Sequence, residues 1–316
     1  MDRPLVSIVT PTYNQAEYIE ETVESVLSQS YSNIEYVVID DGSTDDTPNV
    51  LEKYMGKDGV QIIRYEQNCL GQTKTINMGW EQSNGQILAY LNSDDTYYNE
   101  DVVSEAVEAL ESNLQAHIVY GGSVYTDSTG RTIGTYEAGA VDFDAMVLQG
   151  ANPIPQPSTF IRREVFENVG PLDETIFSPM DWDFWLRSCI KFEFLYVPEV
   201  WSTFRLHPSS KSSRGGSRAA ADFLRIYDKL LEDPDFPDYL KEQRNKLYSR
   251  AHLMAANQND LALDSKSYRS SLWKAWKAYP GNLNMRDYLK WGGSLFGCFW
   301  ELWLSKHRLR RFAKLK

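Results

Sequence analysis

The stretch Val38-Ile39-Asp40-Asp41-Gly42-Ser43-Thr44-Asp45 joins the end of a buried strand to an acidic turn. Residues 34–39 form an apolar, β-branched run, which is typical of a strand with both faces covered. Similar runs occur at residues 5–10, where Pro11 ends the pattern, and at residues 87–91. We therefore predict that these three segments are buried strands of one sheet.

Helical segments separate these strands. Apolar residues recur at helical spacing within residues 16–29 and 102–111, and a helix is also predicted near residues 72–83. Further strands are predicted at residues 61–65 and 117–120. Strands that alternate with helices indicate βαβ units, so the predicted fold class is α/β, with a mostly parallel, Rossmann-like central sheet flanked by helices.

The pattern changes after a small, polar, Gly-containing stretch at residues 208–217, which is typical of a loop or linker. From about residue 218 onward the sequence is almost wholly helical. We expect two parts: residues 1–217 as the sheet domain that carries the chemistry, and residues 218–316 as a helical C-terminal region.

Composition narrows the class of protein. Of the 316 residues, 42% are hydrophobic and 24% charged, which is the balance of a folded globular chain. The chain has 32 Lys+Arg against 44 Asp+Glu, so its net charge of −12 argues against a nucleic-acid-binding surface. Cys69, Cys189 and Cys298 are too scattered for a disulfide framework and fit a reducing compartment. With no signal-peptide pattern and no apolar run of about 20 residues, we expect a cytoplasmic location.

Polar residues come directly after three of the predicted strands: Pro11 to Asn14, Asp40-Asp41, and Asn92-Ser93-Asp94-Asp95. In an open α/β sheet such strand ends meet where ligands bind. Clustered carboxylates need a compensating cation, and oxygen ligands suit Mn²⁺ or Mg²⁺. Because the sequence has neither GxxxxGK[ST] nor GxGxxG, we expect a metal to neutralise a diphosphate, with Tyr13 and Asp41 left for the nucleotide base and ribose.

The motifs together resemble the family 2 glycosyltransferases, which have the GT-A fold with a mixed, mostly parallel sheet. The resemblance extends over roughly two thirds of the chain, to about residue 215. It rests on residues 6–14, 38–45 and 91–95, and continues through Gly71-Gln72, Asn77 to Gly79, Gln156 to Phe160, Gly170 to Glu174, Met180 to Arg187 and Phe204 to Pro208.

The resemblance implies roles in donor binding. Pro11 and Tyr13 would line the slot for the nucleobase, and Asp41 would accept a hydrogen bond from the base. Asn92-Ser93-Asp94 stands where the family has Asp-x-Asp, with the first position facing the ribose or sugar. This chain has Asn92 there, whose amide still bonds hydroxyl groups, so only the last position is expected to bind metal.

The resemblance also implies a metal site and a base. Asp94 would be the metal ligand, and His207 stands where related enzymes place a late metal or phosphate contact. Asp181 corresponds to the carboxylate that deprotonates the acceptor hydroxyl, although Asp183 shares the segment and one of the two is expected to be structural. Lys74 contacts phosphate or is simply a solvated lysine.

These features predict an inverting, metal-dependent transfer of a sugar from a nucleotide-diphosphate sugar, with UDP the expected nucleotide. The acceptor is expected to be a hydroxyl of a glycan or a lipid-linked intermediate in surface polysaccharide or lipopolysaccharide synthesis. A processive synthase is disfavoured because no Gln-x-x-Arg-Trp motif is present, and a nucleotidyltransferase because no Gly-rich, Lys-bearing loop is present. A non-catalytic module of the same fold, which binds a nucleotide-sugar or a glycan, stays as the alternative.

The C-terminal segment has its own character. Residues 289–316 contain seven Lys/Arg and one acidic residue among many Trp, Phe and Leu. An amphipathic helix of this composition can lie on an anionic membrane surface. The alternative is a helix that packs on the sheet domain and ends in a basic segment.

Overall fold

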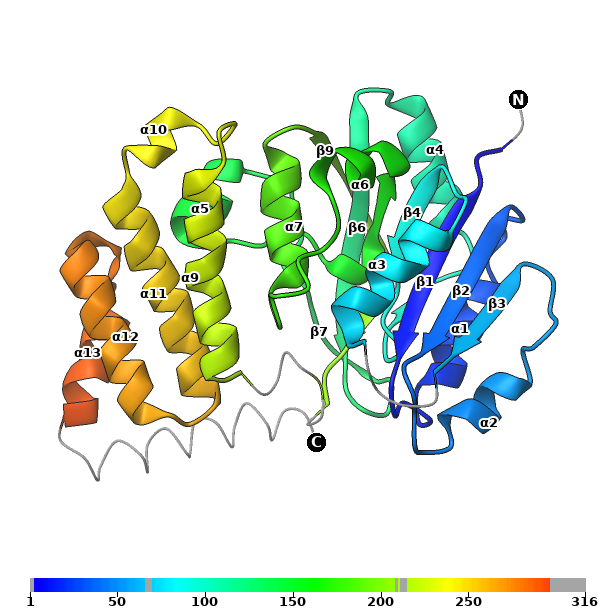
Figure 1. Ribbon diagram of the computed structural model, residues 1–316, viewed down its shortest axis with the longest axis horizontal. Coiled ribbons are helices and arrows are strands. Elements are labelled where there is room, and N and C mark those ends of the chain that lie inside the picture. The colour runs from blue at the N-terminus through cyan, green and yellow to red at the C-terminus, as the bar shows by residue number, and fades with distance from the viewer. Residues whose placement is uncertain (1–2, 66–69, 208–209, 211–214, 296–316) are drawn as a thin grey trace.

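The computed structural model describes residues 3–65, 70–207, 210 and 215–295. Its centre is a nine-stranded mixed sheet in the order β3-β2-β1-β4-β8-β6-β9-β5, with β7 paired to β6 (Figure 1). The strands are β1 Val6–Thr12, β2 Ile34–Asp40, β3 Val60–Arg64, β4 Ile87–Tyr90, β5 Thr96–Tyr97, β6 Ala116–Thr126, β7 Thr132–Thr135, β8 Thr159–Arg162 and β9 Glu193–Arg205. The predicted α/β class and the mixed, mostly parallel sheet are confirmed.

Helices of the sheet region pack on both of its faces. They are α1 Ile19–Leu27, α2 Thr47–Glu52, α3 Gln72–Gln82, α4 Val102–Ser112, α5 Phe143–Gln149, α6 Arg163–Val169 and α7 Met180–Cys189, with the 3-10 helix η1 at Gln156–Ser158. Apolar residues of α1, α2 and α4 bury one face, and those of α3, α6 and α7 bury the other. Alternate residues of β1 enter different clusters, Ile8 with α1 and Val9 with α3, as the two-residue period of a strand requires.

Strand β1 is the central element for the site, because it pairs in parallel with both β2 and β4. The sequence pattern ended this strand before Pro11, whereas the strand continues through Pro11 to Thr12. Its pairing with β4 stops at Val9, and Val9 O accepts the last hydrogen bond on that side, from Leu91 N. Pro11 follows Val9 by two residues and therefore faces the same side of the strand. Because the pairing with β4 has already ended there, the N–H that proline lacks removes no hydrogen bond from the sheet.

Helix α3 lies close against β1 because Gly79 carries no side chain. A Cβ at Gly79 would lie 2.6 Å from Val9 Cγ1, which is closer than packed carbon atoms come. At the start of the same helix, Gly71 has φ +78°, a left-handed conformation that glycine adopts without strain. The close packing holds the beginning of α3 beside the carboxyl ends of β1 and β4.

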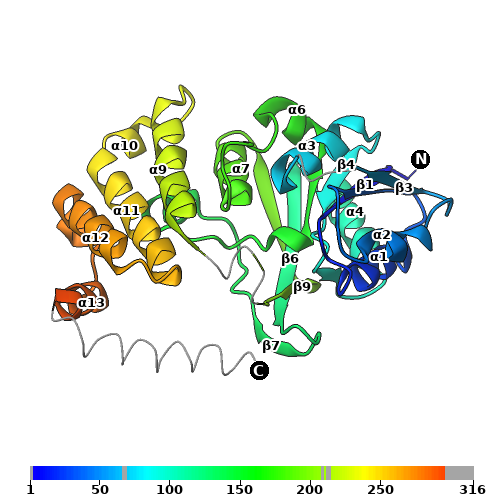
Figure 2. The same ribbon diagram turned by 60° about the horizontal axis from the view of Figure 1, so that its bottom comes forward.

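The C-terminal part is a stack of helices: α9 Ser217–Glu232, α10 Asp238–Lys241, α11 Arg244–Leu261, α12 Ser265–Ala278 and α13 Met285–Leu295, with the 3-10 helix η2 at Pro280–Asn282. Figures 1 and 2 show α7 between the sheet and α9. The Trp182 ring of α7 lies 5.7 Å from the Phe223 ring and 5.9 Å from the Tyr227 ring, both on α9. One apolar cluster therefore runs from the sheet into the C-terminal helices.

Among the described residues no helix has the length and apolar character needed to cross a bilayer. Most of the basic C-terminal segment, residues 296–316, lies outside the described residues, and residues 289–295 belong to α13.

Candidate active site

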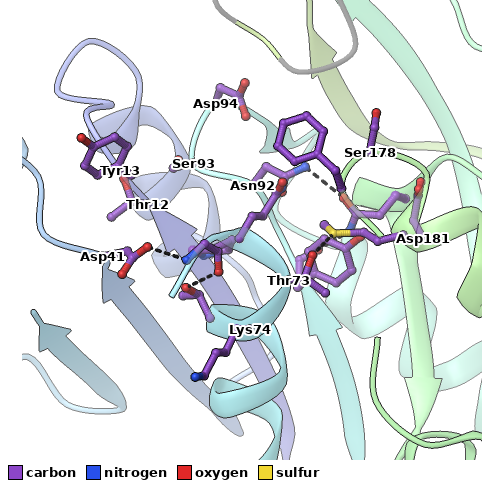
Figure 3. Close-up of a pocket in the computed structure, with 18 of the residues that line it drawn as sticks. Thr12, Tyr13, Asp41, Thr73, Lys74, Asn92, Ser93, Asp94, Ser178 and Asp181 are labelled. Atoms are coloured by element: carbon purple, nitrogen blue, oxygen red, sulfur yellow. Dashed lines mark hydrogen bonds between the residues drawn. The ribbon is translucent and has the colours of Figure 1, made fainter. Parts of the chain in front are cut away.

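A pocket of about 750 Å³ opens where the carboxyl ends of β1, β2 and β4 face α7 (Figure 3). Eight of the predicted site residues line it: Pro11, Tyr13, Asp41, Lys74, Asn92, Ser93, Asp94 and Asp181. The ninth, His207, contacts one of them, Asp94. The structure thus brings together residues that are as many as 196 positions apart, from Pro11 to His207.

The carboxylate of Asp41 accepts hydrogen bonds from the backbone just before α3. Its Oδ1 accepts a hydrogen bond from Leu70 N at 3.1 Å, and its Oδ2 accepts one from Gly71 N at 2.7 Å. The residue is 3% exposed, so these backbone donors stabilise its charge inside the protein. The same side chain also lines the pocket.

A side-chain network surrounds Asn92. Its Oδ1 accepts a hydrogen bond from Gln72 Nε2 at 2.7 Å, while its Nδ2 donates to Gln156 Oε1 at 3.1 Å and to Asp95 Oδ2 at 3.3 Å. Gln156 is fixed in turn by its own donation to Tyr90 O at 2.7 Å. An amide suits this position, because an Asp there would set a second acceptor against the carboxylate of Asp95 and the carbonyl of Gln156.

Asp94 and His207 form a pair at the edge of the pocket. His207 Nε2 lies 2.9 Å from Asp94 Oδ2, and the two side chains are 1% and 18% exposed. His207 also packs against the Tyr18 ring, with 4.9 Å between centroids. Mn²⁺ accepts both carboxylate and imidazole ligands, so the contacting side chains of Asp94 and His207 are a donor pair that fits a divalent ion.

The neighbouring acidic side chain, Asp95, is buried and hydrogen-bonded to other parts of the protein. It is 2% exposed, and its Oδ1 accepts a hydrogen bond from Arg205 N at 2.9 Å while Oδ2 accepts one from Asn92. Burial and the adjacent Asp94 charge raise the pKa of Asp95 well above its usual range. The contacts of Asp95 are those of a residue that supports the site indirectly, and not those of a metal ligand. Within the described parts of the chain no three His, Cys, Asp or Glu side chains converge to hold a metal by themselves.

The two acidic residues of α7 differ in their surroundings. Asp183 is 1% exposed and forms ion pairs with Arg187 at 2.9 Å and with Lys229 at 2.8 Å. Asp181 lies in the first turn of the helix and lines the pocket. Burial, followed by the Asp181 charge, raises the pKa of the Tyr90 hydroxyl well above its usual range. Asp183 is therefore tied to two cationic side chains inside the protein, whereas Asp181 borders the pocket.

Lys74 and Tyr13 are the more exposed members of the predicted set. Figure 3 shows the Lys74 side chain directed away from Asp94 and Asp181, so a phosphate contact from this residue stays a prediction. Tyr13 is 42% exposed and lines the pocket together with Asp41. Next to it, Asn14 adopts φ 53° and its Oδ1 accepts a hydrogen bond from Thr44 N at 2.7 Å, which ties the turn after β1 to the turn after β2.

The opposite side of the pocket is formed by residues 173–181, which we call the loop wall. Its start is held by α3, because the Asn77 side chain exchanges two hydrogen bonds with the backbone of Leu172, at 2.8 and 2.9 Å. The remainder is held by α9. Asp222, which is 1% exposed, accepts hydrogen bonds from Phe177 N at 2.7 Å and Ser178 N at 3.4 Å.

Three further residues on the same face of α9 bind the loop wall. Arg225 donates to Thr175 O at 2.6 Å, and Lys229 donates to Asp173 Oδ2 at 2.7 Å. The Arg218 guanidinium lies 4.4 Å from the centre of the Phe177 ring. The spacing of these α9 residues, including Asp222, is four, three and four positions, which places them on one side of the helix.

Three residues of the site had no predicted role: Gln72, Gln156 and Arg205. The Arg205 side chain is 3% exposed, donates to Asp94 O at 2.9 Å and forms an ion pair with Glu21 of α1. All three lie in segments that carry the family resemblance, so the signal was present in the sequence, but only the folded chain shows that they fix Asn92 and Asp94.

The fold defines the class of protein. The structure of S. aureus TarS 1-349 in complex with UDP-GlcNAc aligns with a TM-score of 0.63 at 16% identity, over 88% of this chain and 90% of that one. Mannosyltransferase PcManGT from Pyrobaculum calidifontis, in complex with GDP-Man and Mn²⁺, aligns with a TM-score of 0.59 at 18% identity, over 99% of this chain and 85% of that one. The likeness is one of fold, the GT-A type of α/β fold.

The sequence comparison gives the family. Residues 7–170 match Glycosyl transferase family 2, and the chain belongs to that family. An uncharacterized glycosyltransferase of Rickettsia bellii is 30% identical over 58% of this chain, and the match spans 27% of that protein. The PGL/p-HBAD biosynthesis glycosyltransferase of Mycobacterium bovis is 27% identical over 59% of this chain and 70% of that protein.

Proposed function

We propose that the protein is an inverting, metal-dependent glycosyltransferase that moves a sugar from a nucleotide-diphosphate sugar to an acceptor hydroxyl. One observation carries the proposal: Asp41, the Asp94–His207 pair and Asp181 line or border a single pocket at the carboxyl ends of parallel strands. Membership of glycosyl transferase family 2 supports the same reaction.

The donor is bound on the side of the strand ends, which we call the sheet wall (residues 11–14, 41 and 92–95). Asp41 and Tyr13 bind the nucleobase, with Pro11 beneath it, and Asn92 and Ser93 border the ribose and sugar. Asp94 and His207 hold Mn²⁺ or Mg²⁺, which supplies Lewis-acid stabilisation of the diphosphate leaving group. Asp94 is kept in place by Arg205, whose guanidinium donates to its backbone carbonyl.

Asp181 acts as general base. It accepts the proton of the acceptor hydroxyl while that oxygen attacks the anomeric carbon from the side opposite the diphosphate. It lies in the first turn of α7, where the amino end of the helix carries partial positive charge. A single displacement of this kind inverts the anomeric configuration.

The nucleobase of the sugar donor and the identity of the acceptor are part of the proposal. Solved neighbours hold UDP-GlcNAc and GDP-Man, so both uridine and guanosine donors are compatible with the fold, and we propose UDP. We propose a glycan or a lipid-linked intermediate as the acceptor; the mycobacterial relative is named for PGL/p-HBAD biosynthesis. Transfer to such an acceptor in surface polysaccharide synthesis would take place on the cytoplasmic side.

The proposal is tested by thermal-shift measurements with UDP-, dTDP- and GDP-sugars, each with and without Mn²⁺. Selective, Mn²⁺-dependent stabilisation by one donor supports the donor site, and release of the nucleoside diphosphate from that donor supports turnover. The variant Asp181→Asn should keep the stabilisation and lose the release. Donor binding without any release, by wild-type protein supplied with glycan and lipid-linked acceptors, would favour the non-catalytic binding module instead.

A further inference from the structure

The helices at the C-terminal end expose large apolar side chains. Trp273 of α12 is 50% exposed, and Met285, Tyr288 and Leu289 of α13 are 74%, 39% and 62% exposed. Figures 1 and 2 show α12 and α13 at the end of the molecule farthest from β3. Soluble proteins seldom leave apolar side chains clustered on adjoining helices without a partner.

Three tryptophans connect the two helices. The Trp273 ring stacks on that of Trp276 with 5.1 Å between centroids, and Trp291 of α13 lies 5.8 Å from Trp273 and 6.3 Å from Trp276. Trp276 and Trp291 pack at the margin of a small apolar cluster that includes Tyr268 and Leu272. Trp273 is thus an exposed aromatic side chain held firmly by two half-buried neighbours.

The same helices are basic, in contrast to the remainder of the chain. Residues 265–295 contain six Lys/Arg and one acidic residue, Asp287, whereas residues 1–264 contain 20 Lys/Arg and 42 acidic residues. Lys266, Lys274, Lys277 and Arg286 are exposed. Within the described residues none of these four has an acidic partner within ion-pair distance.

We propose that the exposed surface of α12 and α13 binds an anionic lipid bilayer. Trp273, Met285 and Leu289 enter the boundary between headgroups and acyl chains, and the lysines of α12 contact lipid phosphates. Aromatic and aliphatic side chains bordered by lysine are the composition that such interfaces favour. The chain continues after α13 with six more Lys/Arg and with Phe296, Phe299, Trp300 and Trp303, so the composition extends beyond the described residues.

A second copy of the chain is the competing occupant, and charge disfavours it. In a symmetric dimer formed through this surface, α12 of one copy would face the same basic helices of the other. Like charges brought together at an interface cost free energy, and the acidic residues that would relieve them lie elsewhere in the chain. An anionic bilayer presents the opposite charge over its whole area. The proposal does not depend on the reaction proposed above.

The test is co-sedimentation of the full chain with vesicles of phosphatidylcholine, with and without phosphatidylglycerol. We expect binding only to the anionic vesicles, and weaker binding as salt is raised from about 0.1 to about 1 M, because salt screens the lysines. The double variant Met285→Ser/Leu289→Ser should lower the partition coefficient about tenfold, since two exposed apolar side chains are lost. Its matched control is Met55→Ser/Leu114→Ser, which removes side chains that are 66% and 76% exposed on the sheet region.

A second pair of variants tests the charge. Lys274→Glu/Lys277→Glu should lower the partition coefficient about 25-fold or more, at about fivefold for each lysine removed near the surface. Lys53→Glu/Lys57→Glu, on exposed lysines of the sheet region, should leave it unchanged.

Three results would overturn the proposal. The first is absence of binding to phosphatidylglycerol vesicles. The second is equal binding by wild type and both α12–α13 variants, which would assign the contact to other residues. The third is a concentration-dependent dimer that Met285→Ser/Leu289→Ser dissociates, which would show that a second copy covers this surface.

Discussion

The two walls of the pocket are built in different ways. The sheet wall consists of turns that come directly after β1, β2 and β4, and its side chains are fixed by contacts with neighbouring segments, as Asn92 is by Gln72 and Gln156 and Asp94 is by His207. The loop wall has no strand beneath it. It is held by backbone hydrogen bonds to Asp222 and Arg225 of α9, a helix that lies outside the family match.

The difference shows that the two walls depend on different parts of the chain. Parallel strands place the sheet-wall residues at one edge of the sheet, where Asp94 is also held by Arg205 and His207 from later in the chain. Asp181, the proposed base, follows a segment that is held by α9, so the C-terminal helices position one wall of the pocket. Variants in the two walls should therefore fail in different ways.

The largest effect is expected from Asp181→Asn in the loop wall. Loss of a general base lowers turnover by about 10³-fold, while the sheet wall keeps donor affinity unchanged. The measurement is the rate of nucleoside diphosphate release together with the donor-induced thermal shift. Glu174→Gln, which alters another carboxylate of the loop wall, is the matched control and should change the rate less than about threefold. Equal losses in the two variants would mean that Asp181 contributes only charge.

Asp94→Asn tests the sheet wall. Removing a carboxylate ligand should weaken Mn²⁺-dependent binding of a nucleoside diphosphate by about 100-fold, with little change in metal-free binding. Titration calorimetry with and without Mn²⁺ measures both. Asp127→Asn serves as control, because Asp127 caps a turn with Thr129 and lies outside the pocket. An unchanged Mn²⁺ dependence in Asp94→Asn would show that the metal is held elsewhere.

Asp222→Ala tests whether the loop wall depends on α9. It leaves the N–H groups of Phe177 and Ser178 without their acceptor, which should cost about 2 kcal/mol in the free energy of unfolding. It should also speed hydrogen exchange in residues 173–181 while exchange at the strand ends stays slow. Asp228→Ala removes an exposed acid from the same helix and should do neither. Faster exchange in both walls would remove the distinction between them.

Asn92→Asp tests whether the sheet wall accepts the acidic residue that the family usually has at this position. The new carboxylate would meet Asp95 Oδ2 and Gln156 Oε1, which now accept hydrogen bonds from Nδ2, so we expect a loss of about 1–2 kcal/mol in stability. Urea unfolding measures it, with the exposed Asn113→Asp as control. A variant as stable as wild type, or more stable, would contradict the view that the amide is needed for this network.

The contrast between the walls also explains what the sequence could predict. Strand ends are local features, so Asp41, Asn92 and Asp94 were found from apolar runs that stop at polar residues. Asp181 was preferred to Asp183 from the family resemblance, but both lie on one helical turn, and only the folded chain shows that Asp183 pairs with Arg187 and Lys229. The roles of Asp222 and Arg205 were not predicted for a related reason: their partners lie 45 and 111 positions away, at Phe177 and Asp94.

The smallest expected effect concerns the far end of the loop wall. Burial raises the pKa of Asp173, but hydrogen bonds from Lys229 and Thr175 outweigh it and lower the pKa to about 2. A pKa that is lower in the folded than in the unfolded chain stabilises the fold above the unfolded value of about 4, and the stabilisation disappears as pH falls through the folded value.

Asp173→Asn should therefore cost about 1 kcal/mol at pH 7, because the pair with Lys229 is partly solvated. The difference from wild type should stay constant down to about pH 4 and shrink toward zero as pH approaches about 2. Urea unfolding between about pH 7 and about pH 3 measures the trend, with Asp228→Asn as the control on α9. A difference that does not change with pH would mean that Asp173 holds the loop wall through its hydrogen bonds from Thr175 and not through its charge, and the contacts of α9 with this wall would then rest on Arg218, Asp222 and Arg225.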